Sequence, residues 1–266
     1  MDRTQLGLAT FHRPGLDLWA WVDLAKELRL GGVELRADPG IAHPEELSPA
    51  ERRKLRSLSE NGLKLSLHMP IHGVNLTWPV RSVAAASLGE VVRTLELAGE
   101  IGADVMVVHP GRVPEEYLHS PQWLERSRDV LRFSLSLLLP CAEKLGVKLA
   151  LENLGSARDR GLVRTAEEHC AILAEFPELF ACFDVGHLHT VGGSPRPHLE
   201  AIFSRLIHVH LHDNRGDWDA HLPLGHGTAP WQETVAILKE KGFSGRVILE
   251  IPDPAGVRES LKNLEK

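Results

Sequence analysis

Histidine and carboxylate side chains recur at the ends of short apolar segments of this chain. Single polar residues follow aliphatic or aromatic runs at His68, His109, Glu152, Asp184 and Glu250. Three more histidines alternate with aliphatic residues from Ile207 to His212. Histidine, aspartate and glutamate without cysteine suit Mn²⁺, Zn²⁺, Fe²⁺ or Co²⁺ better than a structural thiolate zinc site. The pattern therefore predicts a divalent metal centre.

The alternation over 207–212 predicts the direction of its side chains. Successive strand residues face opposite sides, so His208, His210 and His212 share one face. In a barrel the aliphatic face meets the helices, which sends the histidines inward. Two residues advance a strand by about 6.6 Å, so the three cannot all bind one ion.

The elements that position these residues alternate between β-rich runs and amphipathic stretches, as in βαβ units around a parallel sheet. Eight strands are predicted, at 5–9, 32–36, 63–68, 104–109, 147–152, 180–184, 206–211 and 246–250. Helical patterns cover 16–30, 83–101, 123–145, 165–176 and 231–241, and Ser48 before Pro49 predicts a helix N-terminus. This order predicts a single (β/α)8 TIM barrel forming one domain over residues 1–266, with six polar strand ends at one mouth.

Composition restricts the function classes. The chain has 266 residues, 43% of them hydrophobic and 25% charged, and its formal charge is −6. An acidic chain offers no overall attraction for nucleic acid, although a local basic patch stays open. No apolar run is long enough to cross a membrane, so we expect a cytoplasmic protein.

Histidine is over-represented, with 15 residues beside a single tyrosine, and eight of them fall between His187 and His226. Carboxylates and histidines gathered at one mouth are costly to desolvate unless a cation lies between them. The loops add His187, Asp219 and His221 to this set. Four other histidines are expected on the surface: His43, His119, His169 and His198.

These residues, taken together, resemble the xylose isomerase-like TIM barrel superfamily, which includes sugar phosphate isomerases and epimerases and, as a divergent branch, endonuclease IV. The resemblance rests on Gly31-Gly32-Val33-Glu34-Leu35, His68-Met69-Pro70 with Asn75-Leu76, His109-Pro110-Gly111, Glu152-Asn153, Asp184-Val185-Gly186-His187, His210-Leu211-His212-Asp213-Asn214, Asp219-Ala220-His221 and Leu249-Glu250. It covers most of the chain.

The epimerase branch implies one Mn²⁺-type ion, held at positions that match Glu152, Asp184, His210 and Glu250. His187 matches a substrate-contacting histidine. The resemblance to endonuclease IV implies a cluster of up to three zinc ions, with His68, His109, His187, Asp219 and His221 as further ligands. The strand-one Gly-Ala-His motif of that enzyme is absent, since Gly7-Leu8-Ala9-Thr10 stands there.

The resemblance thus implies a metal-dependent isomerase or epimerase of a small sugar or sugar phosphate. Glu152 and Glu250 would act as base and acid beside a carbonyl, with His187 also catalytic, while the metal stabilises an enediolate. The alternatives are hydrolysis of abasic DNA by the zinc cluster, which makes nucleic acid the less favoured partner, and a noncatalytic protein. The oligomeric state stays open, and a homo-oligomer is one outcome.

Other residues carry secondary predictions. His68 is a predicted substrate contact as well as a ligand, and Trp218, like Trp78, lies in a loop where a sugar ring could stack or the indole could simply pack. Arg36 shares the inward parity of Glu34, so an interior ion pair is the favoured interpretation and contact with a substrate anion is the alternative. His208 and His212 are expected to support ligands rather than to coordinate. Asp213 and Asn214 are expected to shape their loop.

Overall fold

Eight parallel strands close into a barrel in the computed structural model, which describes residues 1–155 and 160–265. The strands are β1 (Leu6–Ala9), β2 (Gly32–Arg36), β3 (Lys64–His68), β4 (Val105–Val108), β6 (Lys148–Glu152), β8 (Phe180–Asp184), β9 (Leu206–Leu211) and β10 (Arg246–Leu249). Their order around the barrel is β1-β10-β9-β8-β6-β4-β3-β2. The predicted (β/α)8 TIM barrel is confirmed, and each predicted strand end lies within one residue of the observed one.

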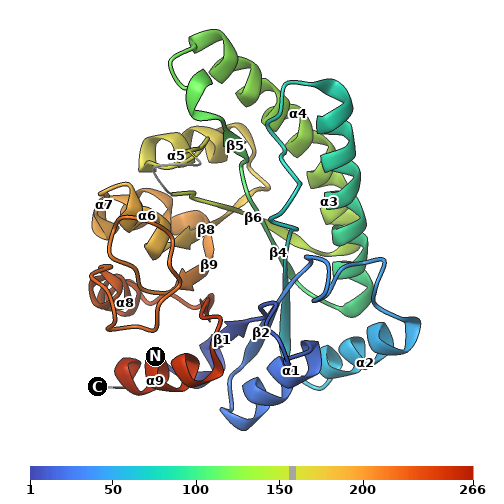
Figure 1. Cartoon of the computed structure of the whole chain (residues 1–266), viewed down its shortest axis with the longest axis vertical. Helices are drawn as coiled ribbons and strands as arrows, with labels where there is room; N and C mark the ends of the chain where they lie inside the picture. Colours follow the sequence, from blue (N-terminus) through green and yellow to red (C-terminus); the bar gives the residue numbers. More distant parts are fainter. Residues whose placement is uncertain (156–159, 266) are drawn as a thin grey trace.

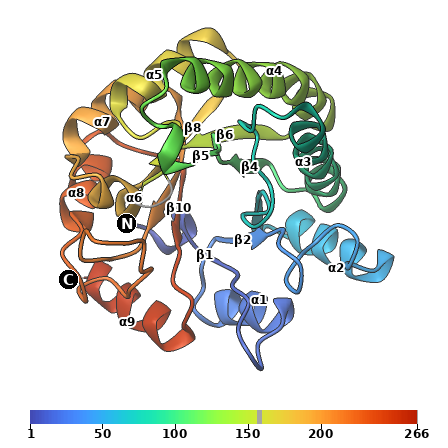
Figure 2. The ribbon, with the colours of Figure 1, turned by 45° about the horizontal axis from the view of Figure 1, so that its top comes forward.

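Helices form an outer ring around the strands (Figure 2). They are α1 (Leu18–Glu27), α2 (Pro49–Glu60), α3 (Arg81–Ile101), α4 (Pro121–Leu145), α5 (Ala166–Glu175), α6 (Val185–Thr190), α7 (Pro195–Ile202), α8 (Trp231–Glu240) and α9 (Pro254–Leu264). Short 3-10 turns cover Arg3–Gln5, Glu115–Tyr117 and Phe203–Arg205. The predicted start of α2 is confirmed, because Ser48 and Glu51 form a capping box ahead of it.

Strand register places the histidines of β9 inside the barrel, as predicted. His210 pairs with Asp184 on β8 and with Ile248 on β10, so alternate residues of the three strands share the inner face. His208, His210 and His212 are fully buried. Val209 and Leu211, which alternate with them, join the main hydrophobic core, whereas Ile207 packs against a smaller cluster. The lower interior is filled by small apolar residues: Val105, Val107, Ala150 and Cys182.

A short antiparallel pair and the chain ends complete the fold. β5 (Arg112–Val113) pairs with β7 (Arg160–Gly161) in the segments that follow β4 and β6. The two termini lie beside α9 (Figure 1), where the Arg3 guanidinium contacts the Glu265 carboxylate. No helix in the part of the chain that the structure describes combines the length and apolarity that a bilayer crossing needs.

Candidate metal centre

Four side chains at the ends of neighbouring strands converge at the carboxyl-terminal mouth of the barrel. Glu152, Asp184, His210 and Glu250 each place one ligand atom within 4.8 Å of the other three, and all are buried. Nδ1 of His210 lies 3.0 Å from Glu152 Oε1, 3.7 Å from Asp184 Oδ2 and 3.6 Å from Glu250 Oε2. We call these four residues the central group. Three carboxylates around one imidazole form a donor set suited to a hard or borderline divalent cation.

Glu152 also faces a second set of histidines with its other oxygen. Oε2 lies 3.0 Å from His109 Nε2 and 3.3 Å from His68 Nε2. The rings of His68 and His109 meet edge to face, with centroids 4.7 Å apart. The carboxylate of Glu152 therefore joins the central group to a flanking group made of His68 and His109.

A further set lies on the other side of the mouth, around Asp219 in the loop after β9. Asp219 Oδ2 lies 3.2 Å from His187 Nε2 and 3.1 Å from His221 Nε2. His187 Nδ1 lies 3.3 Å from Glu152 Oε1, and His221 Nδ1 lies 3.8 Å from Glu250 Oε2, so this outer group borders the central group. The fold thus brings together all nine residues that the sequence predicted as ligands.

Hydrogen bonds to the main chain orient three of these imidazoles in the same way. Nδ1 of His68 lies 2.7 Å from the carbonyl oxygen of Met69. Nδ1 of His187 lies 3.0 Å from the carbonyl oxygen of Asn153, and Nδ1 of His221 lies 2.9 Å from that of Glu250. A nitrogen facing a carbonyl must carry the proton, so the neutral ring keeps its Nε2 lone pair for a ligand. This pattern is typical of metal-binding histidines, whose second nitrogen is held by an acceptor.

The pKa shifts of histidines at the mouth also indicate that positive charge stabilises this cluster of carboxylates. Burial lowers the pKa of His187, but Asp184 and Asp219 outweigh it and raise that pKa well above its usual value. Burial also lowers the pKa of His212, but Asp184 and Asp219 outweigh it and raise this pKa to about 9. Burial dominates at His109, where it lowers the pKa to about 4. Protons on the imidazoles thus hold positive charge among the carboxylates, and a divalent cation would replace them.

His212 links the central and outer groups. Its Nε2 lies 3.2 Å from Asp184 and 3.4 Å from Asp219 Oδ1. Gly186 makes this position available, because a Cβ there would overlap the His212 ring. His212 thus contacts two carboxylates, and its ring nitrogen also lies with ligand atoms of His221 and Glu250 in a group that could hold a metal ion, so its role as a support rather than a ligand stays a prediction.

Most of the chain matches one known protein family. Residues 22–266 match the family described as xylose isomerase-like TIM barrel. The chain belongs to that family. Fructoselysine 3-epimerase of Escherichia coli O157:H7 is 23% identical over 238 residues, which cover 85% of this chain and 82% of the relative. Sugar epimerases are therefore among the relatives of this xylose isomerase-like barrel.

Two solved structures extend the comparison. A D-tagatose 3-epimerase-like protein superposes with a TM-score of 0.84 at 25% identity, covering 98% of this chain and 96% of that one. A Thermus thermophilus protein soaked with ZnCl2 superposes with a TM-score of 0.71 at 29% identity, with coverage of 98% and 96%. The xylose isomerase-like fold thus extends over nearly the whole chain.

Asp213 organises the loop that carries Asp219 and His221. Its carboxylate accepts 2.9 Å hydrogen bonds from the backbone N–H groups of Asn214, Gly225, Gly227 and Ala229. His221 is held in the left-handed region, with φ of +46°. A polar strained loop of this kind keeps its shape only while such contacts persist. The expectation that Asp213 shapes the loop is confirmed.

Replacing Asp213 by alanine is therefore expected to destabilise the protein by roughly 2–4 kcal/mol, because buried N–H donors lose their acceptor. The outer group should lose its geometry as well. Urea unfolding and zinc titration measure the two effects. Asp217→Ala is the matched control, since this exposed aspartate in the same loop accepts a hydrogen bond from the N–H of Trp218 and from no other group of the described residues. Equal stability of the two variants would contradict the role assigned to Asp213.

Other predicted residues lie elsewhere than expected. The favoured ion pair between Arg36 and Glu34 is wrong: Arg36 donates to Asp38 Oδ2 through Nε at 3.2 Å and Nη2 at 3.0 Å. Glu34 instead faces His208 and His210 across the barrel. The prediction was wrong because residue parity indicates which face of a strand a side chain occupies, but not which residue it contacts across the interior.

Three of the four histidines expected on the surface are not exposed. His169 and His198 are buried between the strands and α5 and α7, and only His119 is exposed. His43 is half-buried, with Nε2 3.0 Å from Glu90 Oε1. Trp218 is 62% exposed in the loop after β9, whereas Trp78 packs edge to face on Trp123. Loop packing therefore describes Trp78, and Trp218 remains available at the surface.

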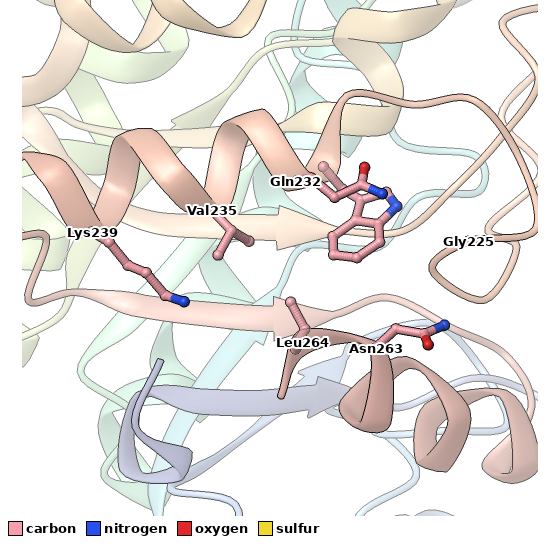
Figure 3. Close-up of a pocket in the computed structure, with 7 residues that line it drawn as sticks. Gly225, Gln232, Val235, Lys239, Asn263 and Leu264 are labelled. Carbon is pink, nitrogen blue, oxygen red and sulfur yellow. The ribbon is translucent and has the colours of Figure 1, made fainter. Parts of the chain in front are cut away.

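An open groove of about 550 Å³ lies outside the barrel between α8 and α9 (Figure 3). Gln232, Val235 and Lys239 line it from α8, and Asn263 and Leu264 line it from α9. Lys239 is the one ionisable side chain of this lining. A single lysine provides neither an acid–base pair nor a set of metal ligands. The candidate functional site is therefore the mouth of the barrel and not this groove.

Proposed function

We propose that the protein is a metal-dependent isomerase or epimerase of a small sugar or sugar phosphate. The observation that carries this proposal is the central group, in which two glutamates flank one imidazole nitrogen. Glu152 and Glu250 end strands that β8 and β9 separate, so their carboxylates reach the same point from two directions. The epimerases among the relatives support the same reaction class.

Glu152, Asp184, His210 and Glu250 would hold the ion, which fits because the carboxylates otherwise attract protons to the imidazoles. When bound, a divalent cation polarises a substrate carbonyl and stabilises the negative charge that develops beside it. A carboxylate has two oxygens, so Glu152 and Glu250 can each ligate through one and exchange a substrate proton through the other. One glutamate removes the proton, and the other returns it on the opposite side.

Four further side chains would bind and orient the substrate. His187 and His68 border the central group and present N–H or lone-pair sites to sugar hydroxyls. Arg36 is held by Asp38 and stacks on Phe11 with its guanidinium carbon 4.8 Å from the ring centroid. A guanidinium fixed in this way suits the phosphate of a phosphorylated sugar. Trp218 would supply an aromatic face at the rim.

Deuterium exchange tests this function. Protein purified without chelator is expected to contain one Mn²⁺-type ion per chain and to exchange a carbon-bound proton of a ketose or ketose phosphate in D2O. Proton NMR of a panel of sugars, with chelator-treated protein as the control, measures the exchange. Absence of exchange across the panel, together with about three zinc ions per chain, would contradict the sugar reaction.

The second candidate is a zinc-dependent phosphodiesterase of the endonuclease IV type, acting on abasic DNA. The flanking and outer groups favour it, because His68, His109, His187, Asp219 and His221 supply ligands beyond those that one ion needs. Neighbouring metal ions clamp the attacking and leaving oxygens of a phosphodiester. Incision of an abasic-site duplex by zinc-loaded protein, and not by the chelated form, would support this candidate.

A further inference from the structure

A pocket of about 380 Å³ opens at the amino-terminal end of the barrel, opposite the candidate metal centre. Lys64, Lys148 and Arg246 line it from the first residues of β3, β6 and β10, and Asp104 lines it from the turn before β4. We call these four residues the basal group. They are the ionisable side chains among the described residues of the lining, so three positive charges face one negative charge in a chain whose formal charge is −6.

Strand parity explains why the three cations gather at this end. Each lies four residues before a candidate metal ligand: Lys64 before His68, Lys148 before Glu152, and Arg246 before Glu250. Because four is an even step along a strand, each cation shares the inner face with the ligand that follows it. Four strand residues span about 13 Å, so the basal group is separate from the metal centre. β3, β6 and β10 are not neighbours in the barrel, so the cations approach the pocket from three sides.

Arg246 reaches across this end of the barrel. Its Nη2 contacts Asp104 Oδ1, although β10 and β4 lie on opposite sides of the strand order. Gly32 leaves room for this path, because a Cβ there would lie 3.5 Å from Cδ of Arg246. The Arg246 side chain is 11% exposed, and its Nη1 is buried with no hydrogen-bond partner among the described residues. Asp104 therefore uses only part of the donor capacity of this guanidinium.

The two lysines of the basal group are exposed and keep their donors for a ligand. In the part of the chain that the structure describes, no carboxylate lies at ion-pair distance from Nζ of Lys64 or Lys148. Each ammonium has three N–H donors and no acceptor. A phosphate group has oxygens in several directions and pairs well with both lysine and arginine. Cations that approach from three sides suit such a tetrahedral anion better than a planar carboxylate.

We propose that the basal group binds a phosphate dianion, either free or carried by a small molecule, with Lys64, Lys148 and Arg246 as its donors. The anion neutralises the excess of positive charge, whereas the charge of Asp104 opposes it. Because the pocket lies at the far end of the strands from the metal centre, the bound phosphate takes no part in the reaction. It stabilises the folded barrel, as any ligand of the folded state does. The site is additional to the proposed function and does not depend on it.

Titration calorimetry of the metal-free protein with inorganic phosphate, at physiological ionic strength, tests the site. The wild-type protein is expected to bind one phosphate per chain, and Lys64→Gln and Lys148→Gln should each lower the affinity about 10-fold, because each removes a charged donor. Both lysines are exposed, so these variants should fold, which urea unfolding without phosphate checks. Asp104→Asn should bind phosphate about 3- to 10-fold more tightly, because it removes the opposing charge.

A parallel titration with glucose 6-phosphate separates the two sources of the anion. Tighter binding of the ester would assign the site to a phosphorylated small molecule, and tighter binding of inorganic phosphate would assign it to the free anion.

Two control variants show where the phosphate binds. Lys26→Gln makes the same chemical change at an exposed position of α1, and Arg36→Gln removes the guanidinium at the mouth. Both should keep the phosphate affinity within about twofold of wild type, because salt screens distant charges. Absence of binding, or equal affinity in the wild type and both basal lysine variants, would overturn the proposal. A loss of affinity in Arg36→Gln instead of the lysine variants, or in Asp104→Asn as large as in the lysine variants, would overturn it as well.

Discussion

Replacing Glu152 by glutamine is expected to release the bound metal and to lower turnover by about 10²- to 10⁴-fold, the usual contribution of a positioned acid or base. Burial raises the pKa of this carboxyl group, but His210 and His109 outweigh burial and hold the pKa well below its usual value. The group is therefore an anion in the folded protein. Glutamine removes that charge and sets an N–H₂ group against imidazoles. Metal analysis and steady-state kinetics measure the two effects.

Glu240→Gln is the control for Glu152→Gln. Glu240 is an exposed carboxylate that pairs with Arg196 on the outside of the barrel, 2.9 Å away, so the same chemical change there should alter neither metal content nor turnover. Retention of metal and activity in Glu152→Gln would show that the central group is not the site. Loss of metal in both variants would point to a general effect of lost negative charge.

The buried pair His169 and His198 is expected to make the protein sensitive to acid. Burial lowers the pKa of His169 to about 3 and that of His198 to about 4, against about 6.5 in an unfolded chain. Between the folded and the unfolded pKa values, the unfolded chain binds more protons than the folded protein. The contribution of the two histidines to the free energy of unfolding is therefore fully present above pH 6.5 and falls as the pH drops toward 4. Two such groups reduce the free energy of unfolding by roughly 2–3 kcal/mol per pH unit. Urea unfolding from pH 8 to pH 4 measures the slope.

The double variant His169→Gln, His198→Gln isolates this contribution. In the native pair, His169 Nε2–H donates to the Leu151 carbonyl at 3.0 Å, and His198 Nε2 lies 3.2 Å from His169 Nδ1. Glutamine can supply similar donors without titrating. With chelator present, the titrating groups at the mouth are the same in both proteins, so the variant should lose stability less steeply below pH 6.5. Parallel curves for the two proteins would refute the assignment.

Much of the candidate site could be predicted from strand parity. A single polar residue after an aliphatic run predicts both a strand end and an inward side chain, which is why Glu152, Asp184 and Glu250 converge as expected. The alternation along β9 and into His212 likewise predicts the burial of His208, His210 and His212. Local pattern is informative here because each strand of a closed barrel repeats the same in-and-out order.

Contacts across the interior and between layers could not be predicted in this way. Glu34 and His208 lie on strands that are not neighbours, so sequence spacing contains no signal for their 2.7 Å contact. His169 and His198 are buried in helices α5 and α7, where polar residues ordinarily face solvent. Their burial depends on how two helices pack against β6 and β8, which is a property of the tertiary structure.

The order of the ligands along the chain has a consequence for biosynthesis. His68 and His109 emerge from the ribosome first, whereas Glu250 follows the last strand, which closes the barrel between β9 and β1. A growing chain folds from its N-terminus and exposes unfinished edges meanwhile. The central group is assembled only when β10 docks, so a nascent chain holds an incomplete ligand set. Binding of metal by the complete ligand set would then follow the docking of β10.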